Sequence, residues 1–334
     1  MNKKILILTQ EVDPHVLPVA RALQSRGAHV LRFDLRDFPE RIQLAASIGP
    51  HGWQGPLTWS GQTVMLSTIH SIWYRRPTLP DAPKAYPPYV REFLNLENLR
   101  GLLGVLQGGE QGPFFWVSQR DRIQAAEYKP VQLSAAHALG LSVPRTLLTN
   151  QPAAAQAFFE ACQGKVVCKA VARGIIDPHR VYLEKEEPRF LFTSRVLPQD
   201  LEASEQIQVC AHFFQELLPK AMDLRIVVIG RHVFPIGIHA HSEQAALDWR
   251  RSYGDVSYSV EQLPDEIKQK LLQLVRHFGL QYSSADFILT PSGDYYFIEL
   301  NPNGQFYWTE PPTGLPMAEA MADLLCFPEE HHLC

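Results

Sequence analysis

The stretch from Ser284 to Trp308, SADFILTPSGDYYFIELNPNGQFYW, constrains the fold of this chain more than any other. Two runs rich in aromatic and aliphatic residues flank a Pro-Ser-Gly-Asp sequence at 291–294, which is typical of a tight turn. The pattern predicts a β-hairpin. With the turn centred on its Ser-Gly pair, Asp286 faces Glu299, and Asn301 lies on the adjacent diagonal of the same face.

Two carboxylates that face each other destabilise a sheet unless a cation or a raised pKa compensates for their repulsion. Asp, Glu and an Asn carbonyl are hard oxygen ligands that suit Mg²⁺, which completes its octahedron with water and substrate phosphates. The alternative is a solvent-facing edge where the carboxylates diverge. Because both runs are otherwise apolar and an Asn-Pro-Asn-Gly turn follows at once, we favour a metal site, and with it a nucleotide.

The composition is that of an ordinary globular protein and argues against several classes. At 334 residues the chain can build two or three domains, and a net charge of −4 with mixed signs gives no footprint for duplex nucleic acid. The five cysteines contain no CxxC pair, which argues against a disulfide framework and a thiolate zinc site. The first apolar run is too short for a secretion signal, and no run reaches the ~20 residues of a membrane span. We therefore expect a cytoplasmic protein without nucleic-acid or membrane partners.

The chain opens with a β-α-β pattern. The run ILILT, a helix that Gly27 ends, and the run AHVLRFDL predict strand, helix and strand. The first turn, TQEVDP, lacks a GxGxxG fingerprint, so we expect a scaffold or substrate-side domain here and no dinucleotide site. Further on, SIWYRRP ends a predicted strand with Arg75 and Arg76, which suit either a bound carboxylate or phosphate or a salt bridge between domains. The clearest amphipathic helix lies within 262–280.

Six stretches occur in order along the chain: RFDLRDFP, SIWYRRP, AAEYKPVQLSAAHALGLSVPRTLLTNQP, FFQELLPKAMDLRIVVIG, DWR and FIELNPNGQFYW. Taken together, they resemble the microviridin-type ligases, the graspetide macrocyclases of the ATP-grasp class. The resemblance covers essentially the whole chain and implies an α/β (α+β) architecture with the ATP-grasp fold. It implies an N-terminal pre-ATP-grasp domain at 1–117, a central lid domain with leader-peptide contacts at 118–212, and a C-terminal catalytic domain at 213–334.

The resemblance also implies roles for individual residues. Lys129 and Lys169 match lysines that bind nucleotide phosphates. Arg225 matches an arginine directed at the terminal phosphate, and Arg250 one directed at the acceptor carboxylate or acyl phosphate. The matched adenine hinge, with an acidic side chain that reaches the ribose, consists of Gln215, Glu216, Leu217 and Leu218. The matched magnesium ligands are Asp286, Glu299 and Asn301. The implied cofactors are ATP and two Mg²⁺ ions, and leader-peptide contacts are expected between Arg189 and Gln208.

Without the family, the two lysines carry unequal weight. A lysine within the apolar run VVCKAV is costly to bury unless an anion meets it, which favours Lys169 as a phosphate ligand. Lys129 alone would be interpreted as solvated helix surface. The segment after Lys169 departs from many ATP-grasp enzymes because it contains only Gly174 as a nearby glycine, so the loop over the phosphates is not predicted.

The two arginines also have structural alternatives. Arg225 lies on a predicted inner strand, where a planar guanidinium suits phosphate oxygens and suits a salt bridge with Asp223 or Glu216 equally well. Arg250 lies in a predicted loop next to a second arginine, so an ordinary surface pair is its alternative.

The expected activity is that of an ATP-dependent carboxylate ligase. Such an enzyme places a carboxylate in line with the γ-phosphate, neutralises the spreading charge and excludes water from the acyl phosphate. The carboxylate would be a Glu or Asp side chain of a ribosomal precursor peptide with leader and core, and a hydroxyl or amine of the same peptide would close a macrocyclic ester or amide. Similar enzymes suggest a homodimer. The alternatives are a ligase that joins two free substrates, a nucleotide-binding regulatory module without turnover, and a kinase on the same fold.

Overall fold

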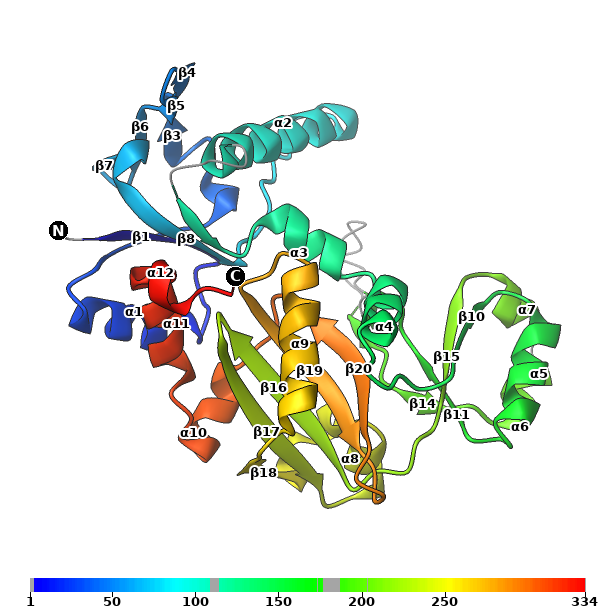
Figure 1. Cartoon of the computed structure of the whole chain (residues 1–334). Helices are drawn as coiled ribbons and strands as arrows, with labels where there is room; N and C mark the ends of the chain where they lie inside the picture. Colours follow the sequence, from blue (N-terminus) through cyan, green and yellow to red (C-terminus); the bar gives the residue numbers. More distant parts are fainter. Residues whose placement is uncertain (1–2, 109–113, 173, 177–186, 203, 334) are drawn as a thin grey trace.

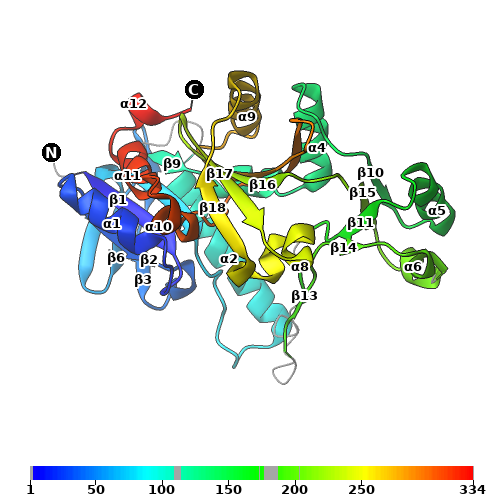
Figure 2. The ribbon, with the colours of Figure 1, turned by 90° about the horizontal axis from the view of Figure 1, so that it is seen from below.

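The computed structural model describes residues 3–108, 114–172, 174–176, 187–202 and 204–333. Its elements form three main sheets that follow one another along the chain (Figure 1). Seen from below, the first and second sheets lie at opposite ends of the molecule, and the third lies between them (Figure 2). The mixture of helices and sheets confirms the predicted class.

The first sheet is parallel and has the order β2-β1-β8-β9. Its strands are β1 (Lys4–Thr9), β2 (His29–Phe33), β8 (Ile69–Arg76) and β9 (Phe115–Val117), and its helices are α1 (Val16–Ser25) and α2 (Pro88–Gln107). Like most parallel strands, β1 is buried on both faces: Leu6 and Leu8 join one core cluster, whereas Ile5 and Ile7 join another. The predicted β-α-β opening is confirmed.

Two small antiparallel sheets lie between β2 and β8. One contains β3 (Ile42–Leu44), β6 (Pro56–Trp59) and β7 (Gln62–Met65), and the other contains β4 (Ser47–Gly49) and β5 (Gly52–Gln54). Gly55 joins them at a φ of +141°, and a Cβ there would lie 1.9 Å from the carbonyl oxygen of Ala45. Only glycine fits this close approach.

The second sheet is antiparallel and has the order β10-β15-β11-β14. Its strands are β10 (Thr146–Thr149), β11 (Val166–Lys169), β14 (Ser194–Arg195) and β15 (His212–Glu216). The accompanying elements are α5 (Pro152–Ala161), α6 (Pro198–Glu202), α7 (Ser204–Gln208) and the pair β12 (Ile175–Ile176) and β13 (Arg189–Phe190). The boundary expected between the lid and catalytic domains, after residue 212, falls inside strand β15. The boundaries of the three domains stay predictions.

The third sheet is antiparallel and has the order β18-β17-β16-β19-β20. Its strands are β16 (Met222–Ile229), β17 (His232–Ala240), β18 (Val256–Val260), β19 (Tyr282–Leu289) and β20 (Tyr295–Asn301). The helices after and around it are α3 (Arg120–Ala126), α4 (Lys129–Ala138), α8 (Glu243–Leu247), α9 (Asp265–His277), α10 (Glu310–Thr313) and α12 (Pro328–His331). The predicted amphipathic helix is confirmed as α9, which buries Leu271, Leu274 and Val275.

Helix α11 (Met317–Cys326) joins the first and third sheets. Its fully buried Met321 belongs to the same core cluster as Ile5 of β1 and Val227 of β16. Arg26, just after α1, reinforces the contact with ion pairs to Glu319 and Asp323 of α11. The two sheets therefore share one hydrophobic core. Among the described helices, none has the length and apolar character needed to cross a membrane.

Candidate active site

The final hairpin contains an irregularity that decides where Glu299 points. Strands β19 and β20 pair Phe287 with Phe297 and Asp286 with Glu299, so β20 has one extra residue, Ile298, between these pairs. On a regular strand Phe297 and Glu299 would point to the same face. The bulge lets Phe297 enter the core with Phe287 while Glu299 turns to the face of Asp286. The predicted pairing of Asp286 with Glu299 is confirmed, but the unbroken register assumed up to the turn is wrong.

Both carboxylates on this face meet a cation. Arg225 of β16 lies opposite Asp286, and its Nη1 is 2.8 Å from Asp286 Oδ1. The ammonium of Lys129 is 3.0 Å from Glu299 Oε2. The amide nitrogen of Asn301 donates to Glu299 at 3.1 Å and to Asp286 at 3.4 Å. The three residues predicted as metal ligands therefore share one face and one hydrogen-bond network.

Lys129 reaches Glu299 because α4 is clamped to the outer edge of β20. One turn further along α4, the Gln132 side chain donates to the carbonyl of Leu300 and accepts from its N–H, both at 2.8 Å. These bonds satisfy backbone groups on an edge strand. The Lys129 ammonium also donates to the carbonyl of Ala170, just after β11, at 2.8 Å. Lys129 is therefore no solvated helix surface residue, and that alternative is wrong.

Burial and neighbouring charges together shift the pKa values of the two carboxylates in opposite directions. Burial raises the pKa of Asp286, and the positive charge of Arg225 offsets this only in part. Burial also acts to raise the pKa of Glu299, but the charges of Lys129 and Arg250 outweigh it and hold that pKa below its ordinary value. Glu299 is therefore ionised at neutral pH. Because its charge repels that of Asp286, a further cation bound between the two carboxylates would stabilise the site.

The chemistry of this set fits magnesium. Two carboxylates and an amide are hard oxygen donors, and three protein ligands leave positions for water and phosphate oxygens. Asn301 turns its amide nitrogen toward the carboxylates, and half a turn of the amide presents its oxygen instead. In the part of the chain that the structure describes, no three His, Cys, Asp or Glu side chains form a metal cluster by themselves. A metal at this face would therefore depend on Asn301 and on oxygens of a ligand.

A cavity of about 1150 Å³ opens beside this face, and all three sheets contribute to its walls. Its volume suits a nucleotide and part of a second substrate. The sequence-predicted residues that line it are Lys129, Lys169, Gln215, Glu216, Leu217, Leu218, Arg250, Asp286, Glu299 and Asn301. The structure thus brings together residues from stretches that lie far apart in the sequence.

Arg225 is the one predicted site residue that supports the cavity without lining it. Its guanidinium is held between Asp286 and the carbonyl of Gln305, to which Nη2 donates at 3.1 Å. Its buried Nε has no hydrogen-bond partner within the described residues. The salt bridges to Asp223 or Glu216 that we considered are wrong, because Asp286 is the carboxylate that Arg225 pairs with.

Lys169 lies in the cavity wall that the second sheet forms. Its ammonium donates to Gln215 Oε1 at 2.7 Å, and burial lowers its pKa to about 8. A buried ammonium whose hydrogen bond goes to a neutral amide favours an incoming anion. The neighbouring Glu216, which is predicted to belong to the adenine hinge, is paired with Arg145, whose Nε and Nη2 lie 3.0 and 3.1 Å from its two oxygens.

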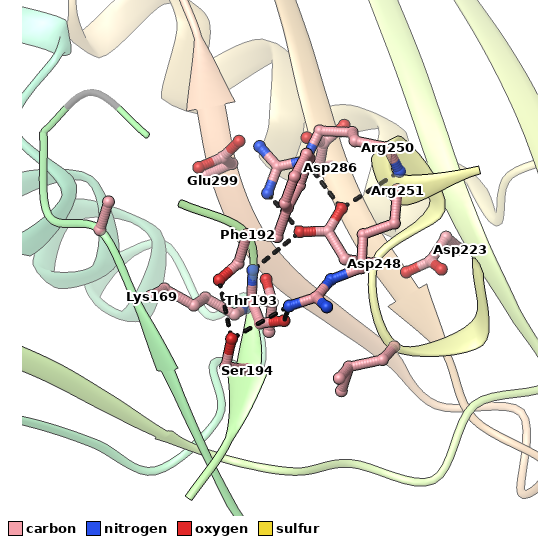
Figure 3. A network of polar contacts seen from close by, with 12 residues as sticks. Lys169, Phe192, Thr193, Ser194, Asp223, Asp248, Arg250, Arg251, Asp286 and Glu299 are labelled. Atoms are coloured by element: carbon pink, nitrogen blue, oxygen red, sulfur yellow. Dashed lines mark hydrogen bonds and ion pairs between the residues drawn. The ribbon is translucent and has the colours of Figure 1, made fainter. Parts of the chain in front are cut away.

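Arg250 lies in the short 3-10 turn Trp249–Arg251, just after α8, and is oriented by Asp248, which the sequence interpretation missed. Its Nε and Nη2 donate to Asp248 at 2.8 and 2.7 Å (Figure 3). This bidentate contact raises the pKa of Arg250, and it lowers the pKa of Asp248 to about 2 although burial acts to raise it. Trp249 stacks on Trp308 at a centroid distance of 5.1 Å and so holds the turn against the loop after β20. Arg250 lines the cavity, so an ordinary surface pair does not describe it.

The loop after the predicted metal ligands is anchored by the first sheet. His15 Nε2 accepts the N–H of Phe306 at 3.1 Å, and His15 Nδ1 lies 3.0 Å from Asp13 Oδ1. Asp13 and His15 follow β1, a central strand of the parallel sheet. Functional side chains gather at the carboxyl ends of such strands, and this rule could have identified the pair from the sequence.

The two arginines that end β8 have different places. Arg75 is buried, donates to the backbone and side-chain oxygens of Asn303 at 3.1 and 3.2 Å, and lies 3.4 Å from Asp13. Its hydrogen bonds to Asn303 therefore link the first sheet to the loop after β20, whereas its ion pair, with Asp13, lies beside the first sheet and is not the salt bridge between domains that we considered. Arg76 lines the cavity and donates to the carbonyl of Asn303.

The buried position of His15 predicts that the stability of the protein depends on pH. Burial lowers the pKa of His15 below its ordinary value of 6.5, so the unfolded chain takes up this proton more readily than the folded protein. The contribution of His15 to stability is then complete above about pH 6.5 and is lost as the pH falls toward the folded-state pKa. We expect the Tm to fall between about pH 7 and 5, and to fall less in His15→Gln. Thermal unfolding at both pH values measures this, and an identical fall in the two proteins would contradict the assignment.

The chain is similar to a known protein family and to several solved structures. The family described as the MvdD pre-ATP grasp domain matches residues 4–124. The macrocyclase MdnC of Microcystis aeruginosa, solved with the precursor peptide MdnA, matches at 30% identity and a TM-score of 0.82, over 97% of this chain and 99% of its own. The macrocyclase MdnB of the same organism matches at 32% identity and a TM-score of 0.78, with the same coverage.

A third similar structure is a RiPP-associated ATP-grasp ligase of Chryseobacterium gregarium, solved with ADP and a leader and core peptide. It is 27% identical, has a TM-score of 0.86, and matches over 98% of this chain and 97% of its own. No curated protein matches the chain. Because relatives at 30% identity or more match over nearly their full length, the chain belongs to the graspetide-type ATP-grasp ligases.

Proposed function

We propose that the protein uses ATP to activate Glu or Asp side chains of a ribosomal precursor peptide as acyl phosphates. A hydroxyl or amine of the same peptide then displaces phosphate and closes a macrocyclic ester or amide. The observation that carries this proposal is the meeting of Asp286, Glu299 and Asn301 on one face of a cavity that also contains Lys169 and Arg250. Ligases of this family that resemble the chain have been solved with precursor or leader and core peptides.

The nucleotide would lie with its adenine against Gln215 to Leu218 and its phosphates between Lys129 and Lys169. The lowered pKa of Lys169 favours this, because an anionic phosphate replaces the neutral amide as its partner. Magnesium would supply positive charge at Asp286, Glu299 and Asn301 and would polarise the terminal phosphate. With that charge in place, the ammonium of Lys129 can leave Glu299 and bind phosphate oxygens.

The carboxylate to be activated would lie at Arg250. Asp248 occupies the edge of the guanidinium formed by Nε and Nη2, and the remaining edge is available to a carboxylate or an acyl phosphate. Arg225 would act from behind Asp286, adding positive charge where negative charge develops on the transferred phosphoryl group.

The decisive test is the mass of the peptide product. Incubation with ATP, magnesium and the precursor peptide should lower the mass of the peptide by one water for each ring. Glu299→Gln should reduce the rate of this reaction at least about 100-fold, because it removes a charged ligand of the metal that stabilises the transition state. The matched control is Glu330→Gln, an exposed change on α12 that should leave the rate unaltered.

Other mass changes would point to the alternatives. A mass gain would identify a ligase that joins separate substrates. Hydrolysis of ATP without loss of water would contradict the macrocyclase proposal. Full activity of Glu299→Gln would contradict the proposed metal site.

We also propose that the leader peptide binds the segment from Arg189 to Gln208, of which residue 203 lies outside the described residues. Apolar side chains in and beside this segment are unusually exposed: Phe190 by 64%, Leu191 by 49% and Ile176 by 55%. A cluster of this kind on the surface suits an apolar peptide segment. Leu191 also lines the cavity, so a leader bound here would continue toward the core peptide.

This placement predicts a selective binding defect. Phe190→Ser should weaken binding of a fluorescent leader peptide about tenfold or more, because it removes a large exposed aromatic contact, while the affinity for ATP stays the same. Phe93→Ser is the control, because this ring is 62% exposed on α2, far from the segment in sequence. Equal leader affinity for all three proteins, measured by fluorescence anisotropy, would place the leader elsewhere.

A cytoplasmic location and a homodimer are further parts of the proposal. The described cysteines Cys162, Cys168, Cys210 and Cys326 are free, which suits a reducing compartment. The fifth, Cys334, lies outside the described residues.

A further inference from the structure

A network of polar contacts joins the turn that carries Arg250 to the second sheet (Figure 3). Asp248 lies at its centre and is only 4% exposed. Arg250 donates to its carboxylate from Nε, from Nη2 and from the backbone N–H, the last at 3.2 Å. The backbone N–H of Thr193 donates to Asp248 Oδ2 at 2.9 Å. One buried carboxylate therefore orients the arginine of the cavity and also holds a segment of the second sheet.

Arg251 completes this contact. Its Nη2 donates to the carbonyl of Thr193 at 2.8 Å and to Ser194 Oγ at 3.0 Å, and its guanidinium lies 5.3 Å from the centre of the Phe192 ring. Asp248 accepts the N–H of Thr193 while Arg251 donates to the carbonyl of the same residue. Both backbone groups of Thr193 are thus hydrogen-bonded to the segment 248–251, which follows α8.

The segment of Thr193 and Ser194 lies beside the strand that contains Lys169, the lysine predicted to bind phosphate. Ser194 in β14 pairs with Cys168 of β11, and Lys169 follows Cys168. Strand β14 has only two residues, so its own backbone pairing gives it little support. The contacts of Asp248 and Arg251 are therefore a substantial part of what fixes this wall of the cavity.

We propose that Asp248 and Arg251 are positioning residues of a latch that keeps the second sheet closed over the acyl phosphate. The latch consists of these two residues together with Thr193 and Ser194, and the proposal rests on the proposed function. Water is excluded from a reactive intermediate only while the walls of its cavity stay together. The latch therefore decides how much acyl phosphate reaches the peptide nucleophile and how much is lost to water.

Two reactions compete for the acyl phosphate. In ring closure, a hydroxyl or amine attacks the acyl carbon, the bond from that carbon to the phosphate oxygen breaks, and the proton of the nucleophile is released. The products are ADP, phosphate and a peptide that has lost one water. In the leak, water attacks the same carbon, the carboxylate returns unchanged, and the net reaction is hydrolysis of ATP. Phosphate released per water lost by the peptide therefore measures the leak.

Arg251→Gln tests the latch, because it removes the donors to Thr193 and Ser194 and leaves the Asp248 to Arg250 pair intact. We expect the phosphate released per water lost to rise about fivefold or more, as the loss of hydrogen bonds to a charged group shifts the closed state toward the open one. Arg251→Lys keeps one charged donor and should give an intermediate ratio.

The control is Arg231→Gln, an exposed arginine in the turn between β16 and β17, which should keep the ratio of the unmodified protein. A general loss of stability would lower both reactions together and leave their ratio constant. An unchanged ratio in Arg251→Gln, or a loss of ring closure and ATP hydrolysis alike, would overturn the latch. If the unmodified protein forms no ring at all, the proposed function fails instead, so the two failures are distinguishable.

Discussion

The carboxylates of Asp286 and Glu299 face each other across one hairpin, and the cations around them compensate for their repulsion. Such repulsion is costly, and burial increases the cost because it removes water. Strand pairing brings Arg225 to Asp286 within the sheet, whereas helix packing brings Lys129 to Glu299 from outside it. The face is therefore balanced by Arg225, which is fixed in the sheet, and by Lys129, which we propose moves to the phosphates when a metal-bound nucleotide binds.

All three sheets contribute to the walls of the cavity, and particular polar groups make several of the contacts between the sheets. His15 and Arg75 bind the loop after β20 to the first sheet through hydrogen bonds. Asp248 and Arg251 connect the third sheet to the second. Helix α11 gives the first and third sheets a common core, so these two form the firm part of the site. The second sheet has a smaller core cluster of its own, and the hydrogen bonds of Asp248 and Arg251 join it to the third sheet, which suits a wall that opens to admit substrates.

Local sequence patterns predicted much of this site. Turn chemistry and alternation placed Asp286 opposite Glu299, and the apolar run around Lys169 indicated a lysine that needs an anion. The bulge was not predictable, because Ile298 is an ordinary strand residue and nothing marks it as extra. The partner of Arg225 was also hidden, since it depends on the pairing of β16 with β19, 61 residues apart, which local propensity does not encode.

A crystal structure with Mn²⁺ in place of Mg²⁺ and a non-hydrolysable ATP analogue tests the central claim most directly, because anomalous scattering locates the metal. The account predicts manganese within about 2.0–2.2 Å of oxygens from Asp286, Glu299 and Asn301. It also predicts that the ammonium of Lys129 has moved from Glu299 to a phosphate. A nucleotide bound in the cavity with its metal on other residues, and with the Lys129 to Glu299 pair intact, would contradict the account.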